Sequence, residues 1–332
     1  MQSILVVTLP FFALVLCGYL AARQHLLPEA AIPGLNAYVL YFALPCLLFR
    51  FGSSMPFAKL IDPALIAIYA LCALVLVALT VSLTRRRVGL KNAAFGALVA
   101  AFPNSGFMGV PLIAELHGPA AAGPVIGTLL VDLFLTSTLC LALAHADHGA
   151  AGGTGATGDG GSAWRSTLRS VVRSLRAALG NPQPWAIALG ALAAATSVTL
   201  PAAAAQLVKM LADSATPVAL FTIGSVLWRA GQHAHTRTPV ADYLPVALIK
   251  LFAHPLLVGG VGLAARAAGL AVSGFGLTVL VLAAALPSAS NVSLLAERFG
   301  ADNGRVARII MASTVLAFAS FTLIAWALTG RG

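Results

Sequence analysis

Apolar residues are gathered along this chain in long runs, and short polar connections between the runs carry most of the charge. A helix needs about 20 predominantly apolar residues to cross the hydrocarbon core of a bilayer. The runs predict ten membrane-spanning helices, at about 3–22, 35–51, 63–83, 92–116, 121–144, 184–200, 212–228, 243–265, 275–297 and 306–328. The chain is therefore expected to be an all-α polytopic membrane protein.

The fourth run is interrupted at its centre by two prolines and two glycines, which stand between residues 103 and 111. Proline removes a backbone donor and blocks the carbonyl one turn earlier. Backbone groups that are freed within hydrocarbon must find partners in protein or water. Asn104 and Ser105 supply side-chain donors and acceptors at this point. They suit a binding site, and they also suit a kinked helix whose own side chains satisfy the backbone.

The ninth run carries a matching interruption. Pro103 and Pro287 are 184 residues apart, and two residues earlier each segment carries a pair of alanines. Downstream, residues 112–118 resemble residues 294–300 at an offset of 182, with Ala-Glu and Gly in corresponding places. Two proline-broken spans at corresponding places in two halves indicate a secondary transporter with internal repeats and a binding site at the bilayer midplane.

The number of spans decides how the two halves are related. Each half contains five predicted spans, so two copies of the unit must enter the membrane in opposite senses, as inverted repeats related by a pseudo-two-fold axis. The expected divisions are a first five-helix repeat at 1–145, a linker at 146–181 and a second repeat at 182–332. The axis brings spans four and nine together, and half-helix N-termini at the breaks would favour an anionic substrate.

Composition agrees with a membrane protein, since 59% of residues are hydrophobic and only 9% are charged. A formal charge of +10 would suggest nucleic acid as the partner of a soluble protein, but here the positive-inside rule explains it. Alternate loops, including Arg85–Arg87, hold 14 basic residues against 5 in the others. The basic side is expected to be cytoplasmic, which places the linker inside and both termini in the periplasm.

Within the linker, residues 149–162 are rich in Gly, Ala and Thr, and flexible structure is expected there. Residues 164–179 place four arginines at helical spacings of four, four and three. That spacing favours an amphipathic basic helix on an anionic membrane surface. A solvated linker is the alternative.

Ionisable residues inside a membrane are rare and usually functional. Asp132 lies near the middle of the fifth span, and Lys250 lies in the eighth, one turn before His254. These three residues are candidates for proton or charge coupling. The alternatives are a structural hydrogen bond for Asp132, an amine of Lys250 that reaches to the membrane surface, and an ordinary core histidine at position 254. Glu115 is expected at a membrane boundary.

Other classes of protein find little support. The chain has no metalloprotease, serine-hydrolase or phosphate-loop motif, so it is not expected to be an enzyme, and no cofactor is expected. The four cysteines, Cys17, Cys46, Cys72 and Cys140, are far apart within apolar runs. They are expected to be small buried hydrophobic residues that form no disulfide or metal site.

Five segments together resemble the auxin efflux carrier family. They are 103–112 (Pro-Asn-Ser-Gly-Phe-Met-Gly-Val-Pro-Leu), 285–300, 41–45 (Tyr-Phe-Ala-Leu-Pro), 221–227 and 250–255 (Lys-Leu-Phe-Ala-His-Pro). The resemblance implies ten helices in inverted repeats, with spans four and nine crossing at their prolines. It also implies a scaffold of spans 1, 2, 6 and 7 that forms a homodimer, and a moving transport domain of spans 3–5 and 8–10.

The short linker makes the chain similar to bacterial members of that family, and residues 286–291 and 130–133 are most similar to malonate carriers. Ser288 stands where plant members tend to carry a longer polar residue, which argues against auxin as the substrate. The expected function is therefore secondary active transport of a small organic anion such as malonate across a bacterial cytoplasmic membrane, by alternating access. A sodium-coupled carrier of the same fold and a non-transporting ligand sensor are the alternatives.

The expected substrate-binding residues flank the two breaks. They are Pro103, Asn104, Ser105, Gly106, Met108, Gly109, Pro287, Ser288, Ser290 and Asn291. Asp132, Lys250 or His254 would carry or sense the coupling proton, and no residues are expected to bind a metal.

Overall fold

The computed structural model describes residues 2–56, 60–151, 172, 176, 179–232 and 238–329. Most of the predicted basic helix at 164–179 and of the Gly-rich segment at 149–162 lies outside these residues. The described part of the chain is all helical apart from one isolated antiparallel bridge. This architecture agrees with the predicted polytopic membrane protein.

The helices occur in two kinds. The α-helices are α1 (Gln2–Arg23), α2 (Ile32–Tyr38), α3 (Leu44–Ser53), α5 (Pro63–Ala101), α6 (Val110–His117), α7 (Ala122–Val131), α8 (Ser137–Ala151), α10 (Pro182–Thr196), α11 (Ala202–Gln232), α12 (Val240–Leu248), α13 (His254–Ala267), α14 (Gly274–Ala285), α15 (Val292–Arg298) and α16 (Asn303–Thr329). Four π-helical turns join some of them, namely η2 (Val39–Ala43), η3 (Ser105–Gly109), η5 (Asp132–Thr136) and η6 (Ile249–Ala253). Two short 3-10 turns are η1 (Glu29–Ala31) and η4 (Pro119–Ala121).

Seven helical segments in the described part are long and apolar enough to cross a membrane. The third predicted span and the first part of the fourth are joined in α5, where Gly89 adopts a left-handed φ of 78° between the two helical parts. The sixth predicted span is the 15-residue α10. The ninth is divided into α14, with 12 residues, and α15, with 7. The spans that fall short of a continuous crossing are therefore the two proline-broken ones and one short helix.

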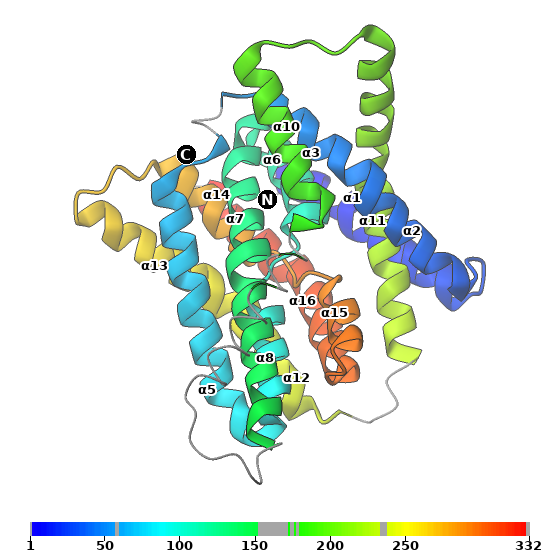
Figure 1. Ribbon diagram of the computed structural model, residues 1–332, viewed down its shortest axis with the longest axis vertical. Coiled ribbons are helices and arrows are strands. Elements are labelled where there is room, and N and C mark those ends of the chain that lie inside the picture. Colours follow the sequence, from blue (N-terminus) through cyan, green and yellow to red (C-terminus); the bar gives the residue numbers. More distant parts are fainter. Residues whose placement is uncertain are drawn as a thin grey trace.

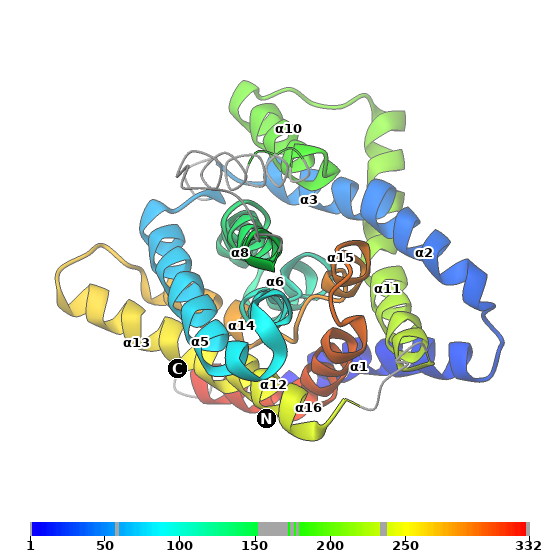
Figure 2. The same ribbon diagram turned by 60° about the horizontal axis from the view of Figure 1, so that its bottom comes forward.

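The helices gather in two groups. In Figure 2, α2, α3, α10 and α11 lie along the upper and right-hand side, whereas α5 and α13 lie to the left. Figure 1 shows the same separation, with α5 and α13 on one side and α2 and α11 on the other. Within the first group α1 packs along α11, and α3 packs along α10.

Glycines allow close helix packing in both of these pairs. A Cβ atom at Gly18 of α1 would lie 1.9 Å from the carbonyl oxygen of Phe221, and one at Gly224 of α11 would lie 1.9 Å from that of Val15. In the other pair, a Cβ at Gly190 of α10 would lie 2.5 Å from the Phe49 oxygen of α3. Small residues at such crossings let two backbones approach where water supplies no hydrophobic driving force.

The two interrupted segments form the interior. Every residue of 93–110 and of 279–290 is buried. A mid-membrane break is tolerated only where protein or a water-filled cavity surrounds it. Pro103 and Pro287 thus both lie within fully buried segments.

Two expectations about single residues are wrong. Cys17 is exposed and Cys46 is partly exposed on the surface of the helices, whereas Cys72 and Cys140 are buried as predicted. Arg305 is one of the 14 basic residues assigned to the basic loops, but it lies in the first turn of α16 and is 1% exposed. Its guanidinium donates to the carbonyl oxygens of Asp242 and Asn92, both at 2.8 Å, so it joins the start of α16 to the start of α12 and to α5 just after its bend at Gly89.

Candidate functional site

The two interrupted segments lie side by side and satisfy each other's backbone. Helix α5 ends at Ala101 and α14 ends at Ala285, and the backbone after each is extended. The Asn104 N–H donates to the Pro287 oxygen at 2.8 Å, and the Ala289 N–H donates to the Phe102 oxygen at 3.0 Å. These bonds form an antiparallel bridge between Pro103 and Ser288. We call this arrangement the crossing.

Helical structure resumes beyond the crossing with a tight approach. The N–H groups of Met108 and Gly109 both donate to the Asn104 oxygen, at 3.2 and 2.9 Å, and this forms the π-helical turn η3. A Cβ at Gly109 would lie 2.6 Å from the Leu286 side chain of the other break. A residue larger than glycine would therefore require the Leu286 side chain to move.

Polar side chains of the crossing are buried. Asn104, Ser105, Ser288 and Ser290 are between 0% and 6% exposed. The Ser105 hydroxyl is hydrogen-bonded to that of Thr128 at 3.2 Å. Burying a polar group without a hydrogen bond is costly, so these side chains need partners in the protein or in a ligand.

Two of the polar atoms at the second break remain without a partner among the described residues. They are Oγ of Ser288 and Oδ1 of Asn291, both buried. The Ser288 backbone, in contrast, is held, because its N–H donates to the Ser313 hydroxyl at 3.2 Å. A rigid backbone that presents unpaired polar atoms is the arrangement expected of a ligand site.

Asp132 lies fully buried in a second polar group near the first break. Its carboxylate accepts hydrogen bonds from the Tyr69 hydroxyl at 2.9 Å and from the Thr136 hydroxyl at 3.0 Å. The Tyr69 hydroxyl also lies 3.4 Å from the carbonyl oxygen of Ala101, the last residue of α5. A hydroxyl has one proton to donate, so Tyr69 can serve only one of these two acceptors at a time.

Lys250 holds the other half-helix. Its amine donates to the Ala284 oxygen at 2.8 Å and is hydrogen-bonded to Nδ1 of His254 at 3.0 Å. Lys250 is 0% exposed, so the alternative that its amine reaches the membrane surface is wrong. The His254 ring lies 5.6 Å from that of Tyr69, and contacts therefore run from Asp132 through Tyr69 and His254 to Lys250.

The structure thus brings the predicted residues into two adjacent groups. Pro103, Asn104, Pro287 and Ser288 meet directly at the crossing, and Asp132, Lys250 and His254 share the polar group described above. The sequence did not indicate Tyr69 or Ser313, because a single neutral polar residue within an apolar helix does not distinguish a functional position from a structural one. Three of the four π-helical turns lie at these two groups of residues. The turn η3 begins directly after Asn104, η5 begins at Asp132, and η6 contains Lys250. Such turns frequently mark functional sites.

The described residues contain no group of three or more His, Cys, Asp or Glu side chains that could hold a metal ion. The polar atoms at the crossing are instead amides and hydroxyls, which bind anions and neutral polar groups through hydrogen bonds.

Comparison with known proteins gives a consistent result over nearly the whole chain. A family described as membrane transport protein matches residues 3–325. A protein of Rhizobium meliloti (strain 1021) named "Putative malonate transporter" is 29% identical over 327 residues, which covers 97% of this chain and 95% of that protein. An "Uncharacterized transporter" of Methanothermobacter thermautotrophicus is 27% identical over 317 residues, covering 95% of both chains. The "Uncharacterized transporter YfdV" of Escherichia coli K12 is 26% identical over 318 residues, covering 93% of this chain and 92% of its own length.

Proposed function

Because the chain belongs to the membrane transport protein family, the family of the auxin efflux carriers, we propose that it is a secondary active transporter of a small organic anion. The observation that carries the proposal is the crossing, whose buried interior presents the unpaired Ser288 hydroxyl, a donor to an anion, and the unpaired Asn291 amide oxygen, an acceptor for a hydroxyl or a protonated carboxyl group. Malonate is the proposed substrate, and the relative named as a putative malonate transporter supports it. Energy would come from an ion gradient, since the sequence has no ATP-binding motif.

Anion binding follows from the chemistry of the crossing. Hydroxyl and amide N–H groups donate hydrogen bonds to a carboxylate. Helical structure restarts at Ser105 and at Val292, and the partial positive charge of each helix start adds to the attraction. Asn104, Ser105, Ser288, Ser290 and Asn291 are the proposed ligands, and Pro103, Gly106, Met108, Gly109 and Pro287 shape the backbone that carries them.

Alternating access requires two bodies that move against each other. The proposed scaffold contains α1, α2, α3, α10 and α11, in which glycines bring α1 close to α11 and α3 close to α10. The proposed transport domain contains the remaining described helices, with the crossing inside it. The scaffold would form the homodimer, and the two domains would derive from inverted repeats at 1–145 and 182–332 with ten spans in all.

Coupling to a proton is proposed for the group around Asp132. When the Asp132 carboxylate is charged, it accepts a hydrogen bond from the Tyr69 hydroxyl. Once protonated, it can donate to Tyr69, whose own proton then reaches the Ala101 oxygen at the end of the half-helix. Protonation would thereby change a contact of the crossing itself. A sodium-coupled carrier of the same fold is the alternative.

Malonate counterflow in proteoliposomes tests the function. Purified protein reconstituted with internal malonate should accumulate labelled external malonate, because a carrier exchanges one molecule for another. A ligand sensor of the same fold would bind malonate without exchange. Binding without counterflow would therefore overturn transport, and the absence of both would overturn malonate as the substrate.

A further inference from the structure

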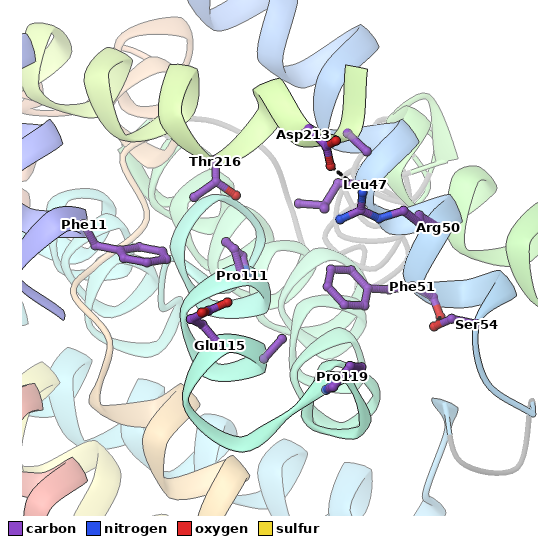
Figure 3. Close-up of a pocket in the computed structure, with 12 residues that line it drawn as sticks. Phe11, Leu47, Arg50, Phe51, Ser54, Pro111, Glu115, Pro119, Asp213 and Thr216 are labelled. Atoms are coloured by element: carbon purple, nitrogen blue, oxygen red, sulfur yellow. Dashed lines mark hydrogen bonds and ion pairs between the residues drawn. The ribbon is translucent and has the colours of Figure 1, made fainter. Parts of the chain in front are cut away.

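A cavity of about 580 Å³ lies where the two groups of helices meet, at the end of the molecule that contains the α6–α7 connection. Its walls come from α1, α3, α6 and α11, so both proposed bodies contribute. Figure 3 shows Pro111 and Glu115 on α6, between the rings of Phe11 and Phe51. We call this cavity the vestibule. Pro111 follows the crossing on the same stretch of chain, seven residues after Asn104.

Among the described residues that line the vestibule, one is a cation, Arg50, and it is already paired. Its guanidinium lies 2.5 Å from the Asp213 carboxylate across the cavity wall, from α3 to α11. The two side chains are 43% and 47% exposed. Water screens a pair of this kind, so little free energy holds it together.

Asp213 does not depend on Arg50 alone. The Lys209 amine lies one helical turn away on α11, 3.3 Å from the second carboxylate oxygen of Asp213. When Arg50 leaves, Asp213 therefore keeps a cationic partner. Arg50 can exchange partners without leaving an unpaired carboxylate behind.

We propose that the vestibule is the first binding site for the transported carboxylate, in which Arg50 leaves Asp213 and binds the incoming anion. The inference rests on the proposed function and adds a specificity-determining residue outside the crossing. A guanidinium binds a carboxylate with two parallel hydrogen bonds, which a lysine amine cannot match. Glu115 on the opposite wall repels an anion and directs it to the Arg50 side.

Competition from Asp213 explains how such a site releases its ligand. A carboxylate that stayed on Arg50 would never reach the crossing, and Asp213 can reclaim the guanidinium. Arg50 and Asp213 therefore have opposite effects on affinity, although they form one ion pair. A purely structural ion pair would give losses of the same sign when either partner is removed.

The test is the KM for external malonate, measured as initial uptake by cells that express each variant at matched membrane levels. Arg50→Gln should raise KM about tenfold, the loss expected for one charge-assisted interaction that is partly screened. Asp213→Asn should lower KM by about threefold, because it removes the competing carboxylate. Arg266→Gln is the matched control, since it removes one exposed cation from the end of α13, away from the vestibule, and should leave KM unchanged.

Two results would overturn the inference while leaving the proposed function intact. One is uptake by the Arg50→Gln variant with the wild-type KM. The other is a rise in KM in both the Arg50→Gln and the Asp213→Asn variants. Failure of the wild-type protein to exchange malonate in proteoliposomes would instead overturn the proposed function, and the vestibule proposal would fall with it.

Discussion

At the scale of single residues, the buried polar side chains divide into those with partners and those without. Ser105, Asp132 and Lys250 all have protein partners at 2.8–3.2 Å. Oγ of Ser288 and Oδ1 of Asn291 have none among the described residues. Because an unpaired buried polar atom destabilises a protein, atoms of the second kind indicate where a ligand would bind.

Asn104→Ala should weaken malonate binding by at least about tenfold while the protein still inserts into the membrane. Removing one hydrogen-bonding partner from a buried site typically costs about 1–3 kcal/mol. The backbone N–H of residue 104 still bonds Pro287 in this variant, so the crossing itself is retained. Titration of malonate against purified protein in detergent gives the affinity.

Asn36→Ala is the matched control for that measurement. Asn36 lies in α2, in the proposed scaffold, and its substitution should change affinity little. Equal affinities in the Asn104→Ala and Asn36→Ala variants would mean that the broken helices are structural kinks and that the anion binds elsewhere.

Asp132→Asn should abolish malonate accumulation driven by a pH gradient, while binding changes by no more than about threefold. The asparagine oxygen can still accept from Tyr69, but the amide cannot take up a proton. Uptake with and without an imposed pH gradient, together with a malonate titration, separates the two effects.

Asp62→Asn provides the comparison at the outer end of the same group of helices. Asp62 caps α5 by accepting from the N–H groups of Ala64 and Leu65, and asparagine caps helices equally well. Proton-driven uptake should survive this change. Wild-type accumulation in the Asp132→Asn variant would reduce Asp132 to a structural role.

At the scale of elements, close contact between helices depends on glycine. The α1–α11 and α3–α10 pairs both have glycines where a Cβ would collide with a backbone oxygen. In the proposed inverted repeats these pairs occupy equivalent positions, because each joins the first span of one half to the second span of the other half. A contact repeated in this way supports one rigid scaffold built from both halves.

Gly224→Ala should lower the free energy of unfolding by about 1–3 kcal/mol, the usual cost of overpacking. The new methyl group would have to lie 1.9 Å from the Val15 oxygen unless α1 moves away. Thermal denaturation of the purified protein measures the effect. Gly231→Ala in the same helix meets no atom within 4 Å and should leave Tm unchanged or slightly higher, because alanine favours helix. A similar Tm for both variants would contradict the tight α1–α11 contact.

At the scale of the whole molecule, the distribution of charge predicts orientation. Arg85–Arg87 lie near the bend of α5 at Gly89, far along the chain from the vestibule residues Arg50 and Asp213. In the proposed topology the positive-inside rule would put Arg85–Arg87 on the cytoplasmic side. Arg50 and Pro119 lie at the alternate connections of that topology, so the vestibule that they line would face outward.

Reporter fusions at Gly155 and Arg331 should report opposite sides of the membrane, with Gly155 cytoplasmic and Arg331 periplasmic. Five spans separate these two points in the proposed topology. A pair of fusions, one active only in the cytoplasm and one active only in the periplasm, makes each site its own control. Both positions on one side would contradict the arrangement of five plus five spans.

Local chemistry explains what the sequence by itself determined. Hydropathy and proline act on their own neighbourhood, so the all-helical membrane class and the two broken segments follow from the residues there. The presence of Asp132 and Lys250 in apolar runs is also a local observation. The motifs around Pro103 and Pro287, together with three further segments, were sufficient to predict the family.

Only the tertiary structure decided which groups meet. The hydrogen bonds from Asn104 to Pro287 and from Ala289 to Phe102 join residues that are far apart in the chain, and their formation depends on how the helices pack. The same holds for the Tyr69 hydroxyl on Asp132, the buried guanidinium of Arg305 and the Arg50–Asp213 pair across the vestibule. A side chain's partners depend on the face of the helix that it occupies and on the neighbour that covers this face. In a chain whose helices are apolar on every side, hydropathy does not distinguish those faces, so only packing could make the choice.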